Sequence, residues 1–175
     1  MRPLREALLE HFGHAAFRPG QEEVVQSVLS GRPTLAVLPT GAGKSLCYQL
    51  PALLAPGTAL IVSPLIALMK DQVDALRERG IPAGKLTSAD DPDEHRATWS
   101  ALLAGELKLL YVAPERLSRP DFRELLSRIE DNEPPEKSLQ RFRLGVRGRP
   151  RQMSKVDFKE KVKEGRSRRS SLIAN

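Results

Sequence analysis

Short apolar runs alternate with longer amphipathic segments along most of this chain, and that alternation constrains its fold more than any other feature. Three runs bounded by glycine or proline read as strands, at 34–38, 58–62 and 107–112, and a weaker fourth lies within 81–88. Helix-like segments occupy 21–30, 43–54, 65–79 and 93–104, and another helix is predicted after Pro114, where Pro120 divides it. Strands without a polar face, joined by helices, predict a parallel sheet covered on both sides. The expected fold class is α/β.

The composition limits the class of protein. A chain of 175 residues with 40% apolar side chains is long enough for one domain. Its single cysteine, Cys47, cannot form an intramolecular disulfide or a four-thiolate zinc site, which favours a reduced, intracellular protein. Secretion is not expected, because Arg5, Glu6 and Glu10 interrupt the apolar stretch that a signal peptide needs.

One stretch, 45–69, holds no charged residue and has the length of a membrane span. Pro51, Pro56, Gly57 and Pro64 interrupt it at spacings typical of helix, turn, buried strand and turn. We therefore predict no membrane association.

The basic residues are unevenly distributed. Residues 1–130 contain 15 Lys/Arg and 16 Asp/Glu, whereas residues 131–175 contain 13 and 6. The second segment also has few large apolar residues, so it cannot bury enough surface to offset the entropy of ordering. We predict a folded part over 1–130 and a basic, disordered tail over 131–175.

The tail contains Arg147-Gly148-Arg149-Pro150, which resembles the core of an AT-hook. Such a segment places its arginines in the narrow minor groove of A·T-rich DNA. The plainer alternative is a solvated basic tail with incidental phosphate affinity. Arg147 and Arg149 are therefore candidate DNA contacts.

The sharpest local motif is LPTGAGKS, at 38–45, between a predicted strand and a predicted helix. It resembles the Walker A loop in the form that helicases use, although Leu38 stands where the common pattern has glycine. Gly41 and Gly43 allow the backbone to curl and to bring its N–H groups toward phosphate oxygens at the positive end of a helix.

Two side chains of this loop carry the expected chemistry. Lys44 places its ammonium on the outer phosphates, and the Ser45 hydroxyl completes the shell of a Mg²⁺ ion. The plainer alternative is a glycine-rich turn with a solvated lysine. We expect Lys44 to be the catalytic residue of this chain. The predicted nucleotide contacts in the loop are Thr40, Gly41, Ala42, Gly43, Lys44 and Ser45.

Three further blocks give the loop its context: FGHAAFRPGQ at 12–21, VSPLIALMKDQV at 62–73 and YVAPERL at 111–117. With the loop, they resemble the opening blocks of the RecQ family of DNA helicases, from about Leu4 to about Leu126. The resemblance implies a partial RecA-like P-loop domain in an ATP-dependent DNA helicase that moves 3′–5′ and acts in repair and recombination. It also implies ATP and Mg²⁺ as cofactors, DNA as partner, and a cytoplasmic, nucleoid-associated location.

The resemblance also implies roles for individual residues. Gln21 matches the glutamine that reads the adenine edge, and its amide offers both a donor and an acceptor. Arg18 and His14 match positions near the base. For Gln21 and for His14 the alternative is a plain surface role. In the block at 62–73, Ser63, the backbone amides around Leu65, and Lys70 are candidate DNA contacts, while the apolar side of the same helix packs in the core.

Parts of the family pattern are missing. Family members continue with a strand that ends in Asp-Glu-Ala-His, whose acidic pair holds Mg²⁺. No such string follows here, and we interpret Asp93-Glu94-His95-Arg96 as an acid-rich helix N-terminus. The second motor domain and the cysteine-rich zinc module are also absent. The resemblance therefore implies an enzyme family, but we expect this chain alone to bind nucleotide weakly and not to unwind DNA.

The break near Glu130 has two explanations. Either the gene is truncated or frameshifted, or the domain is fused to a genuine basic segment. Truncation is favoured, because the break interrupts a half-built sheet. The alternative function is a non-enzymatic basic DNA-binding protein that uses its tail.

Overall fold

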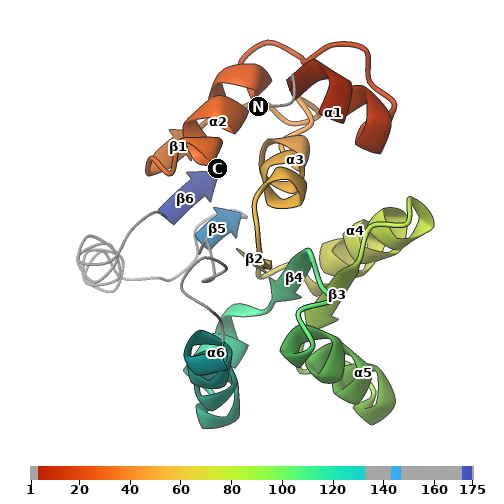
Figure 1. Cartoon of the computed structure of the whole chain (residues 1–175), viewed down its shortest axis with the longest axis vertical. Helices are drawn as coiled ribbons and strands as arrows, with labels where there is room; N and C mark the ends of the chain where they lie inside the picture. The colour runs from red at the N-terminus through yellow and green to blue at the C-terminus, as the bar shows by residue number, and fades with distance from the viewer. Residues whose placement is uncertain (1–3, 133–142, 147–170, 175) are drawn as a thin grey trace.

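The computed structural model describes residues 4–132, 143–146 and 171–174. Figure 1 shows the arrangement of its elements. The helices are α1 (Leu4–Phe12), α2 (Gln21–Leu29), α3 (Leu46–Leu54), α4 (Ile66–Glu78), α5 (Pro92–Leu103) and α6 (Pro120–Asn132), with a 3₁₀ helix, η1, at Pro114–Ser118. The strands are β1 (Thr34–Ala36), β2 (Ala59–Val62), β3 (Ala83–Leu86), β4 (Leu109–Val112), β5 (Arg143–Val146) and β6 (Ser171–Ala174).

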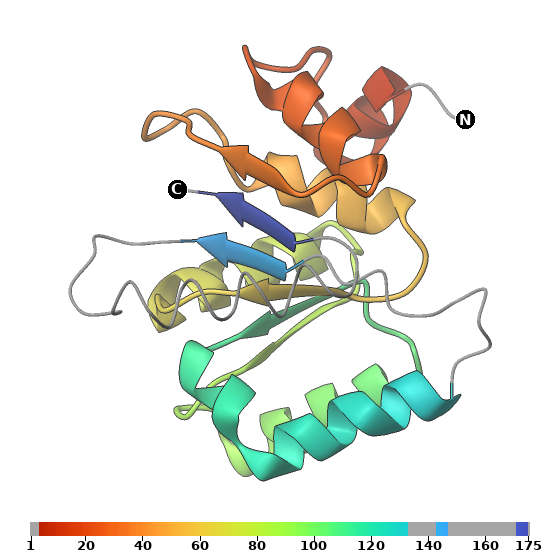
Figure 2. The same ribbon diagram turned by 90° about the vertical axis from the view of Figure 1, so that its left-hand side faces the viewer.

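The six strands form one parallel sheet in the order β1-β6-β5-β2-β4-β3. Figure 2 shows the strands stacked one above another between the helices. The expected α/β class with a parallel sheet is confirmed, and the weak fourth run forms β3. Pro120 divides the last predicted helix into η1 and α6, as expected.

Two hydrophobic clusters lie on opposite faces of the sheet. Alternate residues of β4 point to opposite faces, because successive side chains of a strand do so. Leu109 and Tyr111 belong to the cluster that α1, α3 and α4 cover. Leu110 and Val112 belong to the cluster under α5 and α6, where Phe122 is fully buried. The part of the sheet formed by β2, β4 and β3 is therefore covered on both faces.

Strand β1 is shorter and more exposed than its apolar run predicts. It ends at Ala36 rather than at residue 38, and Leu35 and Val37 are 66% and 72% exposed. In the described part of the chain, the side of β1 that carries Leu35 remains open to solvent. The expectation that this whole run is buried is therefore wrong.

Two short segments within 131–175 form strands in the structure. Strand β5 pairs with β2, and β6 pairs with both β1 and β5. Although β1 and β2 follow each other in the chain, they are not neighbours, and pairing by β5 and β6 satisfies backbone groups that would otherwise form open edges. The AT-hook-like arginines, Arg147 and Arg149, lie outside the described residues.

The acidic string at the start of α5 has the expected structure. The Asp91 carboxylate caps the helix by accepting hydrogen bonds from the amides of Asp93 and Glu94 at 2.7 and 3.0 Å. Pro92 occupies the first turn, where its missing N–H costs nothing. The string therefore begins a helix and does not end a strand.

The uncharged stretch at 45–69 divides into α3, β2 and the start of α4. Within the described ranges, no helix has both the length and the apolar character needed to cross a bilayer.

Candidate functional site

The loop at 38–45 leaves the carboxyl end of β1 and leads into α3, which is the predicted order of strand, loop and helix. Gly41 and Gly43 have φ angles of 82° and 75°, a conformation that other residues adopt only with strain. Helix α3 starts at Leu46 rather than at Gly43, because the positive φ of Gly43 interrupts the helical path. The predicted helix start is therefore wrong by three residues.

The ammonium of Lys44 is folded back onto its own loop. Its Nζ atom donates to the carbonyl oxygen of Leu38 at 2.6 Å and to that of Pro39 at 3.1 Å. Both acceptors are neutral, whereas a bound phosphate would offer charged oxygens and stronger hydrogen bonds. In this geometry the ammonium lies at the loop, where phosphate oxygens could replace the two carbonyl oxygens as its partners.

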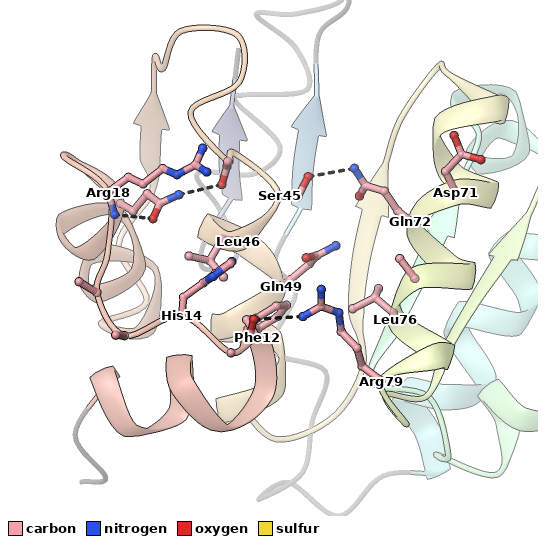
Figure 3. Close-up of a pocket in the computed structure, with 16 residues that line it drawn as sticks. Phe12, His14, Arg18, Ser45, Leu46, Gln49, Asp71, Gln72, Leu76 and Arg79 are labelled. Atoms are coloured by element: carbon pink, nitrogen blue, oxygen red, sulfur yellow. Dashed lines mark hydrogen bonds between the residues drawn. The ribbon is translucent and has the colours of Figure 1, made fainter.

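Two residues of the 12–21 block contact the same loop. The Arg18 guanidinium donates to Gly41 O at 2.5 Å, and the Gln21 amide nitrogen donates to Ala42 O and Gly43 O at 2.9 and 3.1 Å. The Gln21 amide oxygen in turn accepts from the Arg18 backbone N–H at 2.9 Å. The structure therefore brings Arg18 and Gln21 to the loop. Arg18 is labelled in Figure 3.

This approach is possible only because Gly43 has no side chain. A Cβ atom at this position would lie 2.7 Å from the Gln21 amide nitrogen. Gln21 is itself only 3% exposed, so it has little room to move away. Both the positive φ and the close contact explain why residue 43 is glycine.

A cavity of about 530 Å³ opens beside the loop, between the 12–21 block and α4. That size is typical of a small-molecule site. At one end the Arg79 guanidinium donates to Phe12 O at 3.2 Å and lies over the Phe12 ring. The predicted site residues that line the cavity are His14, Arg18, Gln21, Gly43 and Ser45.

Ser45 belongs to a polar network that sequence reasoning missed. Its hydroxyl oxygen accepts a hydrogen bond from the Gln72 amide nitrogen of α4 at 2.9 Å. The Gln72 amide oxygen accepts from the hydroxyls of Tyr48 and Tyr111, the latter at 3.0 Å. Gln49 completes the network by donating to the Tyr111 hydroxyl at 3.0 Å. Although Gln72 and Tyr111 lie within the 62–73 and 111–117 blocks, no sequence pattern indicates this network, because its contacts join helices and a strand that are distant in sequence.

The two tyrosines of this network are buried, at 6% exposed for Tyr48 and 1% for Tyr111. Burial raises the pKa of each phenol above its ordinary value, since the charged form is poorly solvated there. Both hydroxyls therefore keep their protons at neutral pH and act as donors.

The DNA-contact candidates lie around the start of α4. Ser63 is only 3% exposed, and its hydroxyl accepts from the Leu65 backbone N–H at 3.2 Å. Leu65 is 47% exposed. Lys70 is exposed and forms an ion pair with Asp74 at 3.0 Å, and the hydrogen bond to that carboxylate raises the pKa of Lys70. Of the three candidates, Leu65 and Lys70 are accessible, whereas the Ser63 hydroxyl faces inward.

The predicted Mg²⁺ ligand of the loop is the Ser45 hydroxyl. Over the residues that the structure describes, no group of three acidic, histidine or cysteine side chains is placed to hold a metal. Mg²⁺ commonly takes most of its ligands from water and substrate phosphates, with few from protein. The donor set fits a metal that arrives with a nucleotide.

Comparison with known proteins finds helicases by family model, by sequence and by fold. The family model described as DEAD/DEAH box helicase matches residues 18–146. The "ATP-dependent DNA helicase RecQ" of Haemophilus influenzae is 49% identical over 116 residues, which are 66% of this chain and 19% of that protein. The RecQ helicase of Bacillus subtilis is 46% identical over 127 residues, which are 71% of this chain and 22% of that protein. The chain thus spans about a fifth of the length of these relatives.

Among solved structures, the helicase MrfA bound to DNA and AMPPNP superposes with a TM-score of 0.64 at 22% sequence identity. The alignment covers 83% of this chain and 20% of MrfA, and at this identity it supports the fold alone. The family model, by contrast, covers well over half of this chain. The chain therefore belongs to the DEAD/DEAH box helicase family and has RecQ-type DNA helicases as its homologues.

Proposed function

We propose that this chain binds ATP with Mg²⁺ at the loop 38–45 and forms the opening part of the first motor domain of a RecQ-type DNA helicase. The observation that carries the proposal is the meeting of two sequence blocks: Arg18 and Gln21 contact the curled loop that ends in Lys44 and Ser45. Separate blocks converge on one cavity at the carboxyl end of a parallel strand, where α/β folds bind ligands.

Each residue then has a stated role. The amides of the loop and the Lys44 ammonium hold the phosphates, and Lys44 exchanges its carbonyl partners for phosphate oxygens. The Gln21 amide, now on the carbonyls of Ala42 and Gly43, carries the donor and the acceptor that an adenine edge requires. Arg18 and His14 flank the cavity where the base would lie.

Mg²⁺, when bound with ATP, neutralises charge on the phosphates and orients them for transfer. Ser45 would contribute its hydroxyl oxygen to that ion. Thr40 and Ala42 would contribute their backbone groups to the phosphate-binding loop. In this structure the Ala42 N–H donates to the Pro39 carbonyl oxygen at 3.1 Å.

DNA is the proposed partner, at the start of α4. The RecQ relatives are named as DNA helicases, and MrfA was solved with DNA. Leu65 and Lys70 are accessible there, and Ser63 supports the turn through its bond to the Leu65 amide. Movement in the 3′–5′ direction, a role in repair and recombination, and a nucleoid location are the finer parts of this proposal.

Substituting Lys44 tests the nucleotide site. Lys44→Ala is expected to weaken binding of a fluorescent ATP analogue about tenfold to a hundredfold, because one charge-assisted contact contributes about 1.5 to 3 kcal/mol. The measurement is an equilibrium fluorescence titration. Arg96→Ala, which removes a cation from the exposed face of α5, serves as the control and should bind like the unsubstituted chain. Equal affinities for Lys44→Ala and the control would contradict the assignment.

A further inference from the structure

We propose that Gln72 is a positioning residue that holds the Ser45 hydroxyl in place for Mg²⁺ and ties this ligand to α4. The inference rests on the proposed nucleotide site and assigns a role within it to a residue outside the loop. Figure 3 shows the Gln72 amide reaching from α4 across to Ser45. The bond between Gln72 Nε2 and Ser45 Oγ is 2.9 Å long.

The other end of the Gln72 amide determines its orientation. The amide oxygen accepts from two phenol hydroxyls, those of Tyr48 and Tyr111. Since Gln49 donates to the Tyr111 oxygen, the Tyr111 proton is free to point at Gln72. Two donors on the oxygen side leave the NH₂ group facing Ser45. In this orientation both ends of the amide are bonded, the oxygen to the two phenols and the NH₂ group to Ser45.

The network is also rigid. The Tyr48 and Tyr111 rings pack edge to face at 6.4 Å between centroids, and both are buried. Gln49 is 8% exposed and belongs to α3, the helix that follows the loop. A side chain whose amide bonds to two buried hydroxyls has little rotamer freedom, so it can hold a partner in one position.

The consequence falls on the Ser45 oxygen. A hydroxyl oxygen has two lone pairs, and the Gln72 N–H takes one of them. The second remains for a metal, and the rotation of the hydroxyl is restricted before the metal arrives. Such preorganisation lowers the entropic cost of binding. Gln72 should therefore matter for Mg²⁺ and not for the nucleotide's contacts with Lys44.

Gln72 also connects two proposed sites. Helix α4 is preceded by Leu65, a DNA-contact candidate, and Gln72 lies about two helical turns further along the same helix. Leu65 and Gln72 therefore belong to one continuous turn and helix. The Mg²⁺ ligand and the DNA-contact region are thereby joined by one helix and one hydrogen bond.

The test is the Mg²⁺ dependence of nucleotide affinity in the 175-residue chain. A fluorescent non-hydrolysable ATP analogue is titrated with MgCl₂ and, separately, with EDTA, and the ratio of the two affinities is the Mg²⁺ gain. Gln72→Leu is expected to reduce the Mg²⁺ gain about fivefold to tenfold, the size of one ordinary hydrogen bond. Its affinity in EDTA should stay within about twofold of the unsubstituted value, because Lys44 and the loop amides are unchanged.

A matched control and a second variant complete the design. Gln26→Leu makes the same chemical change on the exposed side of α2 and should retain the full Mg²⁺ gain. Gln72→Leu leaves the Tyr48 and Tyr111 hydroxyls without the amide oxygen that accepts their hydrogen bonds. If that variant does not fold, the triple variant Tyr48→Phe/Gln72→Leu/Tyr111→Phe removes these hydroxyls as well and is expected to show the same reduced Mg²⁺ gain.

The outcomes are distinct. An unchanged Mg²⁺ gain in a folded Gln72→Leu chain, or in the triple variant, would overturn the positioning role while leaving the nucleotide site intact. Equal losses with MgCl₂ and with EDTA would also overturn it, since they would indicate a general structural effect. No binding by the unsubstituted chain in either buffer would refute the proposed function, and the role of Gln72 would fall with it.

Discussion

Replacing Lys85 with methionine is expected to lower the free energy of unfolding by about 3 to 5 kcal/mol, the range found when one partner of a buried ion pair is removed. Lys85 lies on β3 and is 8% exposed. Its ammonium contacts Asp90 at 2.5 Å and Glu94 at 2.9 Å. Without it, the Asp90 carboxylate, whose side chain is only 1% exposed, remains charged and buried. Urea denaturation monitored by circular dichroism measures the change.

The pH dependence of this destabilisation follows from Asp90. Burial alone would raise the pKa of Asp90, but the Lys85 ammonium and the hydrogen bonds from Thr87 outweigh it and lower that pKa below its ordinary value of 3.8. A lowered carboxyl pKa stabilises the fold above the unfolded-state pKa, and that stabilisation is lost as pH falls through the folded-state pKa. In Lys85→Met only the Thr87 bonds remain to oppose burial, so Asp90 should protonate at higher pH. The difference in stability should be full at pH 7 and should shrink toward about pH 4.

Arg96→Met is the matched control for Lys85→Met. Arg96 forms an ion pair with Asp93, and both side chains are exposed, so the loss should stay within about 0.5 kcal/mol. Similar destabilisation by the two substitutions would show that the Lys85 cluster is not a buried network.

The second large effect concerns catalysis. We expect the 175-residue chain to bind ATP yet to hydrolyse it at least about a thousandfold more slowly than an intact RecQ helicase, even with single-stranded DNA. Phosphoryl transfer needs metal, positioned water and an arginine together, and loss of the arginine alone costs about 10³ to 10⁵ in rate. The chain has no Asp-Glu-Ala-His string, and its described residues hold no cluster of acids for a metal.

A phosphate-release assay with the intact Bacillus subtilis RecQ helicase in parallel measures this difference. The same preparation should bind the fluorescent ATP analogue, which shows that the chain is folded. DNA-stimulated hydrolysis within about tenfold of the intact enzyme would mean that this chain assembles a catalytic centre without the Asp-Glu-Ala-His string.

Much of the fold could be predicted from local pattern. The apolar runs at 58–62 and 107–112 became β2 and β4, because uninterrupted apolar residues between turns favour strands that are buried on both faces. The loop followed a strand and preceded a helix, as the glycines at 41 and 43 indicated. These features depend on residues that are neighbours in the sequence, so they could be predicted from the sequence alone.

Features that depend on distant contacts were missed. Leu35 and Val37 were expected to be buried because they lie in an apolar run, but both are exposed. Whether a strand is buried depends on which elements cover it, and the apolar run does not determine that. Strands β5 and β6 were not anticipated, because strand pairing across the gap between β1 and β2 is a tertiary effect that overrides a basic composition. Gln72 was overlooked beside Lys70, since its importance comes from Tyr48 and Tyr111 and not from its own neighbours.

The most direct test of the nucleotide site is an amide chemical-shift map of the isotope-labelled chain, recorded before and after addition of ATP with Mg²⁺. Residues 40–46 are the proposed phosphate-binding segment, so their amides should show the largest changes, and Lys44→Ala should greatly reduce these changes at the same ATP concentration. Shifts concentrated elsewhere, with the loop amides unmoved at saturating ATP, would contradict the assignment of this loop as the phosphate-binding site.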